Sequence, residues 1–356
     1  MRFDIFDVNM NRITFIDKYI SMLWREEYNG TGAFLLELTE NDDYIKSIRP
    51  DCFVTASGRS AVMVITSVTV KNGIITASGK MASWIMSNMV CSEILRLEDF
   101  DASSGLIEIG NAGDLADFIK TALLSAYNNH PSQSYSAFAY DKKITYHATT
   151  YLNDYYGEET GKEPVLDIVK RVCKLGDIGF MIRRSTDSST PPLYLYLYKP
   201  SDADANIKKT FSPEFGNMKD YSITWSVENY KNYAVALLAE DQTEGFAVDG
   251  SDTPKPYRDT VINVSSYENQ DVALGTAHAQ LKNFDNIVNV NFTPIGDGFD
   301  IGDVVRIVIN KYGVDLKRRI TKYTIQESKN KVSKSIEVGT PIAKIAYIEN
   351  GRTVYY

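Results

Sequence analysis

The segment SAVMVITSVTVKNGIITASGK, residues 60–80, restricts what this chain can fold into more than any other stretch. Its flanks are rich in β-branched residues, and Asn72-Gly73 between them tolerates the positive φ angles of a tight turn. The segment is therefore predicted to form a β-hairpin. Other short strand-like segments divided by turns fill residues 1–98, so this part is expected to be a small antiparallel β-barrel or sandwich.

The hydrophobic pattern changes after residue 98. Residues 111–129 and 163–180 carry apolar side chains at helical spacing, and Pro164 suits the start of the second helix. The apolar positions are Leu115, Phe118, Ile119, Ala122 and Leu123 in the first segment and Val165, Ile168, Val169 and Val172 in the second. Leucine and tyrosine then alternate in LYLYLY, residues 193–198, as in a strand. Residues 99–212 are therefore predicted to be a mixed α+β domain.

Strand patterns return from residue 213 to residue 342 and form a second β-rich block. A polar stretch from Asp241 to Arg258 and a helical stretch from about Gln270 to Phe284 interrupt it, so 241–284 is expected to be an insertion. Residues 343–356 read as an edge hairpin around Asn350-Gly351. The chain is thus expected to contain two β-rich blocks separated by a helix-containing block.

Length and charge limit the possible functions. A chain of 356 residues is long enough for two to three domains. Its net charge of −8 argues against stable binding of nucleic acid, which needs clustered Lys and Arg to release counterions. The basic run Lys317-Arg318-Arg319 is interpreted as a solvated strand end. Aromatic residues make up 12% of the chain and include 23 tyrosines, which favours strands because rings pack well on a pleated surface.

The cysteines and the N-terminus bear on the compartment. Cys52, Cys91 and Cys173 lie far apart and are odd in number, so a disulfide framework is not expected and a reducing compartment fits better. The N-terminal segment MRFDIFDVNMNR has no apolar core of the kind found in signal peptides. No stretch approaches the ~20 apolar residues of a membrane span.

The sequence predicts no catalytic, cofactor-binding or metal site, and each candidate has a structural interpretation that we prefer. His130, His147 and His278 lack the spacing of metal ligands. The GDGFDIGD segment around Gly302-Asp303 lacks the ligand spacing and terminal glutamate of a calcium loop and is interpreted as turns. ASGRSAV, residues 56–62, has no nucleophile-elbow pattern, and TASGK, residues 76–80, lacks the first glycine of a phosphate loop.

Two further features could serve a polysaccharide. Asp154, Glu158 and Glu159 are acidic neighbours in a tyrosine-rich segment, but the sequence cannot place two carboxylates on opposite sides of a sugar. We interpret this segment as a solvated loop. The alternating tyrosines of LYLYLY could stack on sugars, yet a half-buried sheet face that packs on helices is the preferred interpretation.

The order of elements resembles the hub proteins at the tail tip of long-tailed bacteriophages, which are related in fold to the baseplate hub of contractile-tailed phages. Three stretches carry this resemblance, and together they span nearly the whole chain. The first contains Arg12-Ile13, Ser21-Met22-Leu23-Trp24, Gly30, Gly32 and Phe34–Leu38; the second is the 61–80 hairpin followed by MASWIMSNMV; the third contains Gly302-Asp303-Val304-Val305, Arg319-Ile320-Thr321 and Gly339.

The resemblance implies an α+β, β-dominated fold with two similar small β-barrel domains and α/β insertion domains. The first hub barrel would be 1–98, followed by an α+β domain at 99–212. The second barrel would be 213–342, interrupted by 241–284, and the C-terminal hairpin 343–356. Three chains would assemble as a homotrimeric, pseudo-hexameric ring. The two barrels are then expected to superpose strand for strand.

The resemblance also implies a function. The chain would be a non-enzymatic structural protein of the virion, made in the host cytoplasm, that links the tail tube and distal tail protein ring to host-facing components. Its other partners would be the tape measure protein and tail fibre or receptor-binding proteins, and DNA would pass through the ring without specific binding. Two alternatives remain: a tail-associated cell-wall or polysaccharide hydrolase that uses residues such as Asp154 or Glu158, and a receptor-binding tail protein that uses the tyrosine-rich loops.

Overall fold

A computed structural model describes a large part of the chain, including both predicted β-rich blocks. The described residues are 1–92, 95, 118–119, 121–123, 125–126, 145–147, 162–175, 178–185, 192–198, 207–228, 230–238, 242–247, 256, 258–264, 274, 277, 280–281, 288–328, 331–339, 346–349 and 352–355. Strands predominate over helices in these residues, as the sequence predicts.

Two groups of strands form most of the fold. The first strand group comprises β1 (Phe3–Phe6), β2 (Arg12–Ile16), β3 (Ser21–Glu27), β4 (Ala33–Thr39), β5 (Phe53–Ala56), β6 (Met63–Lys71) and β7 (Ile74–Met81), with the short helix α1 (Asp42–Ser47) between β4 and β5. The second strand group comprises β13 (Lys209–Phe211), β14 (Met218–Trp225), β18 (Val288–Pro294), β19 (Val304–Ile309), β20 (Val314–Ser328) and β21 (Lys331–Val338), with the 3-10 turn η5 (Asn310–Tyr312). The predicted hairpin around Asn72-Gly73 is confirmed as β6–β7.

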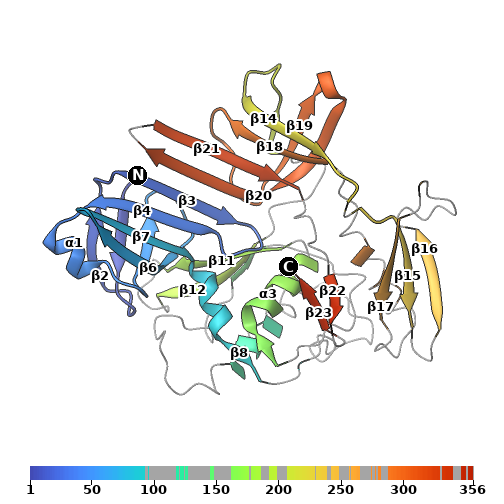
Figure 1. Cartoon of the computed structure of the whole chain (residues 1–356), viewed down its shortest axis with the longest axis horizontal. Helices are drawn as coiled ribbons and strands as arrows, with labels where there is room; N and C mark the ends of the chain where they lie inside the picture. The colour runs from blue at the N-terminus through green and yellow to red at the C-terminus, as the bar shows by residue number, and fades with distance from the viewer. Residues whose placement is uncertain are drawn as a thin grey trace.

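The two strand groups belong to one thirteen-stranded sheet. Its main path runs β14-β18-β21-β20-β3-β4-β7-β6-β5-β1-β2, and β19 joins it by pairing with β20 and β13. Figure 1 shows the red β20–β21 hairpin beside the blue β3–β4 hairpin. Within the described residues, no strand pair closes either group into a barrel. The edge of β3 that closure of the first group would require is occupied by β20.

The two groups repeat the same strand arrangement. In chain order, β3, β4, β5, β6 and β7 correspond to β14, β18, β19, β20 and β21, and corresponding strands have corresponding antiparallel neighbours. The strand order and pairing that the expected duplication requires are therefore present in these strands. The first strands differ, because β1 pairs antiparallel with β5 whereas β13 pairs parallel with β19.

The duplication extends to single residues. The register between β6 and β7 shifts between Ile65 and Ser67, and the register between β20 and β21 shifts between Ile320 and Lys322. Extra residues of this kind bend a strand and increase its twist. Both groups therefore bend the longer hairpin at the same place, which makes Ser67 the counterpart of Lys322.

The turns that precede β5 and β19 also match. Asp51 and Gly302 occupy the same position with positive φ angles of 68° and 87°. The Asp51 amide donates to the Ile65 carbonyl and the Gly302 amide to the Ile320 carbonyl, both at 2.9 Å. The Gly302-Asp303 segment is thus part of a turn, as the sequence predicts, and its counterpart in the first group performs the same structural role.

A helix-containing unit, which we call the α/β unit, lies between the strand groups in sequence. It comprises η1 (Ala82–Asn88), β8 (Val90–Cys91), β9 (Thr145–His147), β10 (Glu163–Pro164), α3 (Val165–Leu175), β11 (Gly179–Arg184) and β12 (Leu193–Tyr198), and residues 118–119, 121–123 and 125–126 are helical. The expected apolar stripe of α3 is fully buried, directly after Pro164. Leu115 lies outside the described residues.

The first strand group is buried on both faces where it meets the α/β unit. Val54, Met63 and Ile65 point into the core that the two strand groups share, whereas Phe53 and Val64 point into the core of the α/β unit. Successive side chains of a strand point to opposite faces. This double burial explains the continuous apolar run at residues 61–65, which an exposed hairpin would not need.

A separate small sheet is inserted between β14 and β18. It contains β15 (Tyr233–Leu237), β16 (Thr243–Ala247) and β17 (Asp259–Asn263), and it lies at the right of Figure 1. The sequence analysis expected β15 in the second barrel, but β15 pairs with β16 and β17 instead. Its Ala234 and Ala236 pack in a core of their own with Ile262 and Leu281. At the C-terminal end, β22 (Ala346–Glu349) pairs antiparallel with β23 (Arg352–Tyr355), and the expected turn at Asn350-Gly351 lies outside the described residues.

Gly302 provides a test of the turn that the two groups share. A Cβ atom added there would lie 2.8 Å from Cε2 of Tyr28 and 3.0 Å from Cε2 of Tyr198, in a conformation with positive φ. Gly302→Ala should therefore lower the free energy of unfolding by about 2–4 kcal/mol, since backbone strain and overpacking add. Thermal or urea unfolding measures the change.

Gly313→Ala is the matched control, because Gly313 has a φ of 63° and no atom within 4 Å of the added Cβ. It should lose only the backbone contribution of about 1 kcal/mol. Equal losses in the two variants would show that the rings of Tyr28 and Tyr198 do not restrict this position.

Candidate functional site at the seam between the strand groups

The candidate site is the seam where β3 and β20 pair. β3 has β4 on one edge and β20 on the other, so its backbone is hydrogen-bonded on both sides. Trp24 lies opposite Ile325, and Glu26 lies opposite Tyr323. Trp24 and Glu26 point to the same face of β3, because side chains two positions apart in a strand share a face. This face is the shared core of the two groups.

Glu26 is a carboxylate buried in that core, with only 1% of the residue exposed. The indole Nε1 of Trp24 donates a hydrogen bond to Oε1 of Glu26 at 2.8 Å. Nε of Arg59 donates to the same oxygen at 2.9 Å, and Nη2 of Arg59 donates to Oε2. A buried carboxylate is tolerated only when it is paired and hydrogen-bonded. The tryptophan and the arginine together supply these partners.

Arg59 connects the two strand groups. Its Nη2 also donates to Oδ1 of Asp300 at 2.7 Å, and its guanidinium carbon lies 4.8 Å from the centre of the Tyr323 ring. Burial alone would lower the pKa of the guanidinium, but the hydrogen bonds and charges of Glu26 and Asp300 raise it, so Arg59 is a permanent cation. The first group thus places a charge against a carboxylate and an aromatic ring of the second.

Tyr28, directly after β3, lies where three parts of the molecule meet. Its amide donates to the Thr321 carbonyl of β20 at 2.9 Å, and its carbonyl accepts from the Phe180 amide of β11 at 3.0 Å. Its hydroxyl donates to the Tyr198 carbonyl at 3.2 Å, and the two rings form an edge contact. One residue therefore ties the two strand groups and the α/β unit together.

Arg319 closes this junction from the side of the second group. Its Nη1 donates to the Gly302 carbonyl at 2.7 Å, and its guanidinium carbon lies 5.2 Å from the centre of the Tyr28 ring. The sequence interpretation of Lys317-Arg318-Arg319 as a solvated strand end is wrong for Arg319, of which only 8% is exposed. The reason is that the strand bends after Arg319, so its side chain is covered by the turn at Gly302.

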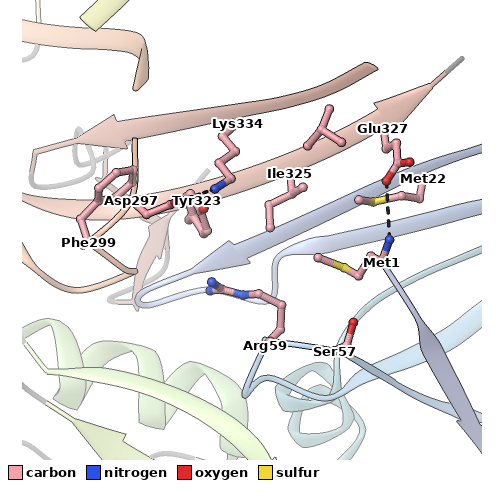
Figure 2. Close-up of a pocket in the computed structure, with 12 residues that line it drawn as sticks. Met1, Met22, Ser57, Arg59, Asp297, Phe299, Tyr323, Ile325, Glu327 and Lys334 are labelled. Atoms are coloured by element: carbon pink, nitrogen blue, oxygen red, sulfur yellow. Dashed lines mark hydrogen bonds and ion pairs between the residues drawn. The ribbon is translucent and has the colours of Figure 1, made fainter. Parts of the chain in front are cut away.

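An open hollow of about 420 Å³ lies along the seam. Figure 2 shows Arg59 and Ser57 on the side of the first group and Tyr323, Ile325 and Lys334 on the side of the second. Charged groups around the hollow are paired with one another: Lys334 with Asp297 at 2.5 Å and the amino group of Met1 with Glu327 at 3.7 Å. The hollow is therefore part of the contact between the groups, and its paired charges do not indicate a ligand.

The structure places several sequence candidates in structural positions. Residues 76–80 are part of the strand β7, so TASGK does not form a phosphate-binding loop. Leu193, Leu195 and Leu197 are buried in the core of the α/β unit. The ring of Tyr196 stacks on that of Tyr198, and the guanidinium carbon of Arg183 lies 3.5 Å from the centre of the Tyr196 ring. Tyr196 and Tyr198 are therefore engaged within the protein, as the preferred interpretation predicts. Their face packs against the core of the strand groups, however, and it is the leucine face that packs on the helices.

Other candidates lie outside the described residues, namely His130, His278, Asp154, Glu158 and Glu159. His147 is part of β9. In the part of the chain that the structure describes, no group of His, Cys, Asp and Glu residues could hold a metal ion. No helix among those residues is long and apolar enough to cross a membrane. Cys52, Cys91 and Cys173 are buried, and none of them forms a disulfide within the described residues.

Sequence reasoning missed Glu26, Arg59 and Tyr28. Arg59 lies inside ASGRSAV, which was considered only as a nucleophile motif, and its partner Glu26 is 33 positions away. The only local signal was the alternation around Trp24, which predicts that Glu26 points to the same face as the tryptophan. A carboxylate on an apolar face indicates that a cation is buried beside it, but the sequence does not identify the residue that carries this cation.

We compared the chain with known proteins to find which of them share this fold. At the level of sequence, no protein-family model and no curated protein matches the chain. Solved structures do match: a tail protein from Neisseria meningitidis MC58 with a TM-score of 0.63 and 12% identity, over 94% of this chain and 96% of that chain. The 43 kDa tail protein of prophage MuSo2 from Shewanella oneidensis has a TM-score of 0.61 and 12% identity, over 96% and 99%.

The prophage tail protein gp18 from Listeria monocytogenes EGD-e matches with a TM-score of 0.60 and 9% identity, over 96% of this chain and 95% of that chain. The chain has the fold of bacteriophage tail proteins. The resemblance in fold that the sequence predicts is therefore confirmed. The tail-protein fold extends over both strand groups, because each match covers almost the whole of both chains.

Removing Arg59 should weaken the seam of this tail-protein fold strongly. In Arg59→Met, the Glu26 carboxylate stays buried without its cation, which should lower the free energy of unfolding by about 3–5 kcal/mol. Arg306→Met is the control, because Arg306 pairs with Asp315 on the exposed surface and should unfold close to the wild type. Thermal unfolding compares them, and a small loss in Arg59→Met would contradict a buried, essential pair.

The stability of the protein should respond differently to removal of the hydroxyl groups of the two tyrosines at the junction. The Tyr198 hydroxyl is buried with no hydrogen-bond partner among the described residues, and burial raises its pKa well above the usual value. Tyr198→Phe should therefore leave the stability unchanged or raise it slightly, whereas Tyr28→Phe loses a hydrogen bond and should cost about 1 kcal/mol. Denaturant midpoints of the two variants decide this, and a clear loss in Tyr198→Phe would mean that its hydroxyl is satisfied.

Proposed function

We propose that this chain is a structural hub subunit of a bacteriophage tail tip, which assembles as a trimer into a pseudo-hexameric ring. The observation that carries the proposal is the duplicated strand group, joined edge to edge through β3 and β20. Two similar groups per chain give six similar units in three chains. Such a ring can match a partner of sixfold symmetry, which a ring of three unrelated units cannot do. The likeness in fold to phage tail proteins supports this role.

In this role, the two strand groups take the places expected for the two hub barrels, although neither closes into a barrel within the described residues. The α/β unit and the small sheet would be insertions on the outside of the ring. The division at 1–98, 99–212, 213–342 and 343–356 remains part of the proposal. The sheet pairing of β15 favours an insertion that begins before residue 233 instead of at residue 241. Its corresponding position in the first group is the short connection between β3 and β4, at residues 28–32.

The proposed partners are the distal tail protein ring and tail tube above, the tape measure protein, and tail fibre or receptor-binding proteins that face the host. The ring would be part of the virion, after assembly in the host cytoplasm. DNA would pass through its lumen without being held. Three copies with a charge of −8 each carry −24, so a lumen that is neutral or negative would repel phosphates.

A role of this kind requires no reaction, and we propose that the chain is not an enzyme. The buried polar groups of the seam pair with one another instead of facing a substrate. Among the described residues, no observation favours a hydrolase or a receptor-binding site over the hub. The structural role therefore explains more of the geometry than either alternative.

The assembly can be tested on the purified full-length chain at high concentration. Electron microscopy should show rings with threefold symmetry and a sixfold-like outline. Light scattering should give a mass of three chains, which is 3 × 40.0 kDa or about 120 kDa. If the protein needs a neighbouring ring to assemble, the same rings should form once the distal tail protein is added. A stable dimer or tetramer in the presence of that partner would contradict the proposal.

A further inference from the structure

Among the strand edges that lack a partner in the described part of the chain, two are related to the seam by the internal duplication. One belongs to β6, whose residues 67–71 pair with β7 on one edge and with no described strand on the other. The second belongs to β14, which pairs with β18 on one edge and ends the sheet on the other. Open edges expose unsatisfied amide and carbonyl groups that can pair with another strand.

The chain itself contains a template for filling these edges. β6 corresponds to β20, and β14 corresponds to β3. β20 has β21 along one edge, while its other edge pairs first with β19, over residues 314–319, and then with β3, over residues 322–328. In the first group, β5 pairs only with the start of β6, so the stretch that corresponds to the β3-binding part of β20 is the open one.

We infer that β6 of one copy pairs antiparallel with β14 of a second copy, in the same way as β20 pairs with β3 within the chain. This inference deepens the proposed function and rests on it for the number of copies, since it identifies the contact that repeats around the ring. The contact is heterologous, because a different edge is used on each side. Every copy has one edge of each kind, so repetition of the contact leads to a closed ring or to an open filament.

The register of the contact follows from the internal duplication. In each group, one row of paired residues crosses four neighbouring strands: β3, β4, β7 and β6 in the first group, and β14, β18, β21 and β20 in the second. The two rows are aligned at Ser67 and Lys322, which directly follow the matching register shifts. The rows are Leu23, Leu35, Ser78 and Ser67 in the first group and Ser222, Asn291, Glu337 and Lys322 in the second. Within the chain, Leu23 lies opposite Gln326, whose counterpart in β6 is Lys71. Lys71 should therefore lie opposite Ser222 of the next copy.

This register brings like faces together. Val68 would lie opposite Trp225 and Val70 opposite Ile223, on the apolar face of the sheet. The alternate pairs, Thr69 with Thr224 and Lys71 with Ser222, would be polar. Paired side chains on antiparallel strands share a face, so a shift by one residue would place valine against threonine. Apolar matching was not used to derive the register and therefore supports it independently.

The exposure of these side chains fits a covered state. Val70 is 48% exposed and Trp225 is 55% exposed, whereas Ile325, the counterpart of Val70 at the seam, is 6% exposed. Val68 and Ile223 are partly buried and already pack against the shared core. Joining two copies would continue this core from one chain into the next, just as the seam continues it within the chain.

Cysteine crosslinking tests the register directly. In the seam, the Tyr28 amide donates to the Thr321 carbonyl, which makes Thr324 and Arg25 a pair without direct hydrogen bonds. The Cα atoms of such a pair are close enough for a disulfide. Its counterpart between copies is Thr69 with Thr224.

Chains with Thr69→Cys, mixed with chains with Thr224→Cys and oxidised, should form a covalent two-chain product. Chains that carry both substitutions should form a ladder of products that ends at three chains.

A positive and a negative control accompany this crosslinking experiment. Arg25→Cys combined with Thr324→Cys should crosslink within one chain, because this pair is present at the seam. Lys71→Cys mixed with Thr224→Cys is out of register by two residues and should give at least about tenfold less product, because the diagonal neighbours are too far apart. The native cysteines are buried and should not interfere. Equal yields from the matched and the shifted pairs would overturn the inference.

A second experiment addresses affinity without a crosslink. Trp225→Glu should weaken self-association by about tenfold or more, because it places a charge in an apolar contact. Phe215→Glu is the matched control, because Phe215 is 67% exposed and lies outside β14. Both variants should keep the wild-type melting temperature. Sedimentation velocity measures the association.

The outcomes separate the inference from the proposed function. Trimers that form normally in Trp225→Glu, with no crosslink between Thr69→Cys and Thr224→Cys, would leave the hub function standing and refute the strand pairing. Crosslinks in the expected register that propagate into filaments, with no three-chain rings in any condition, would support the pairing and refute the trimeric hub. Absence of both crosslinks and trimers would refute both.

Discussion

The pairing of β3 with β20 is the contact on which the rest of the fold depends. It joins two groups of strands that lie at opposite ends of the sequence, and it makes β3 an interior strand with partners on both edges. Tyr28 then extends the connection to the α/β unit through its carbonyl and its hydroxyl. Without this pairing, β3 would be an open edge of the first group, and the shared core would lose one wall.

The polar groups beneath the seam explain why this pairing has one register. Glu26, Trp24 and Arg59 form a closed set of hydrogen bonds, and Arg59 also contacts Asp300 and Tyr323 of the second group. A slip of β3 by one residue would turn Trp24 and Glu26 away from the core and leave Arg59 without its carboxylate. A buried ion pair contributes less to stability than an apolar contact of the same size, but breaking it is costly. We therefore expect its main effect here to be the exclusion of other alignments.

The duplicated architecture connects the fold with the proposed role. Each group has one edge on a long, bent strand, β6 or β20, and another on a shorter strand, β3 or β14. Within the chain, the edge of β20 pairs with the edge of β3. The other pair remains open in the single chain. This arrangement suits the proposed ring, because the contact between the two halves of the chain could be repeated between copies. The fold of phage tail proteins, which the chain shares, is consistent with such use.

Local patterns in the sequence were sufficient for the elements and for the broad fold. Period-two alternation and Asn72-Gly73 predicted the β6–β7 hairpin, helical spacing after Pro164 predicted α3, and the order of the β-rich blocks led to the resemblance in fold. Each of these signals arises from neighbouring residues, because turns, strand alternation and helix faces depend on positions a few residues apart. The sequence by itself therefore determined the parts and their order.

Only the tertiary structure decided how the parts are joined. The pairing of β3 with β20 connects residues about 300 positions apart, as the hydrogen bond from Tyr19 to Glu327 at a separation of 308 illustrates. A contact of this range leaves no periodic signal in a single sequence, since many strand edges offer the same backbone groups. The same reason explains why β15 was expected with the wrong sheet and why Arg59 was not recognised as the partner of Glu26. Edge choice and burial are properties of the folded chain, and they determine which strands lie inside the sheet and which keep an open edge.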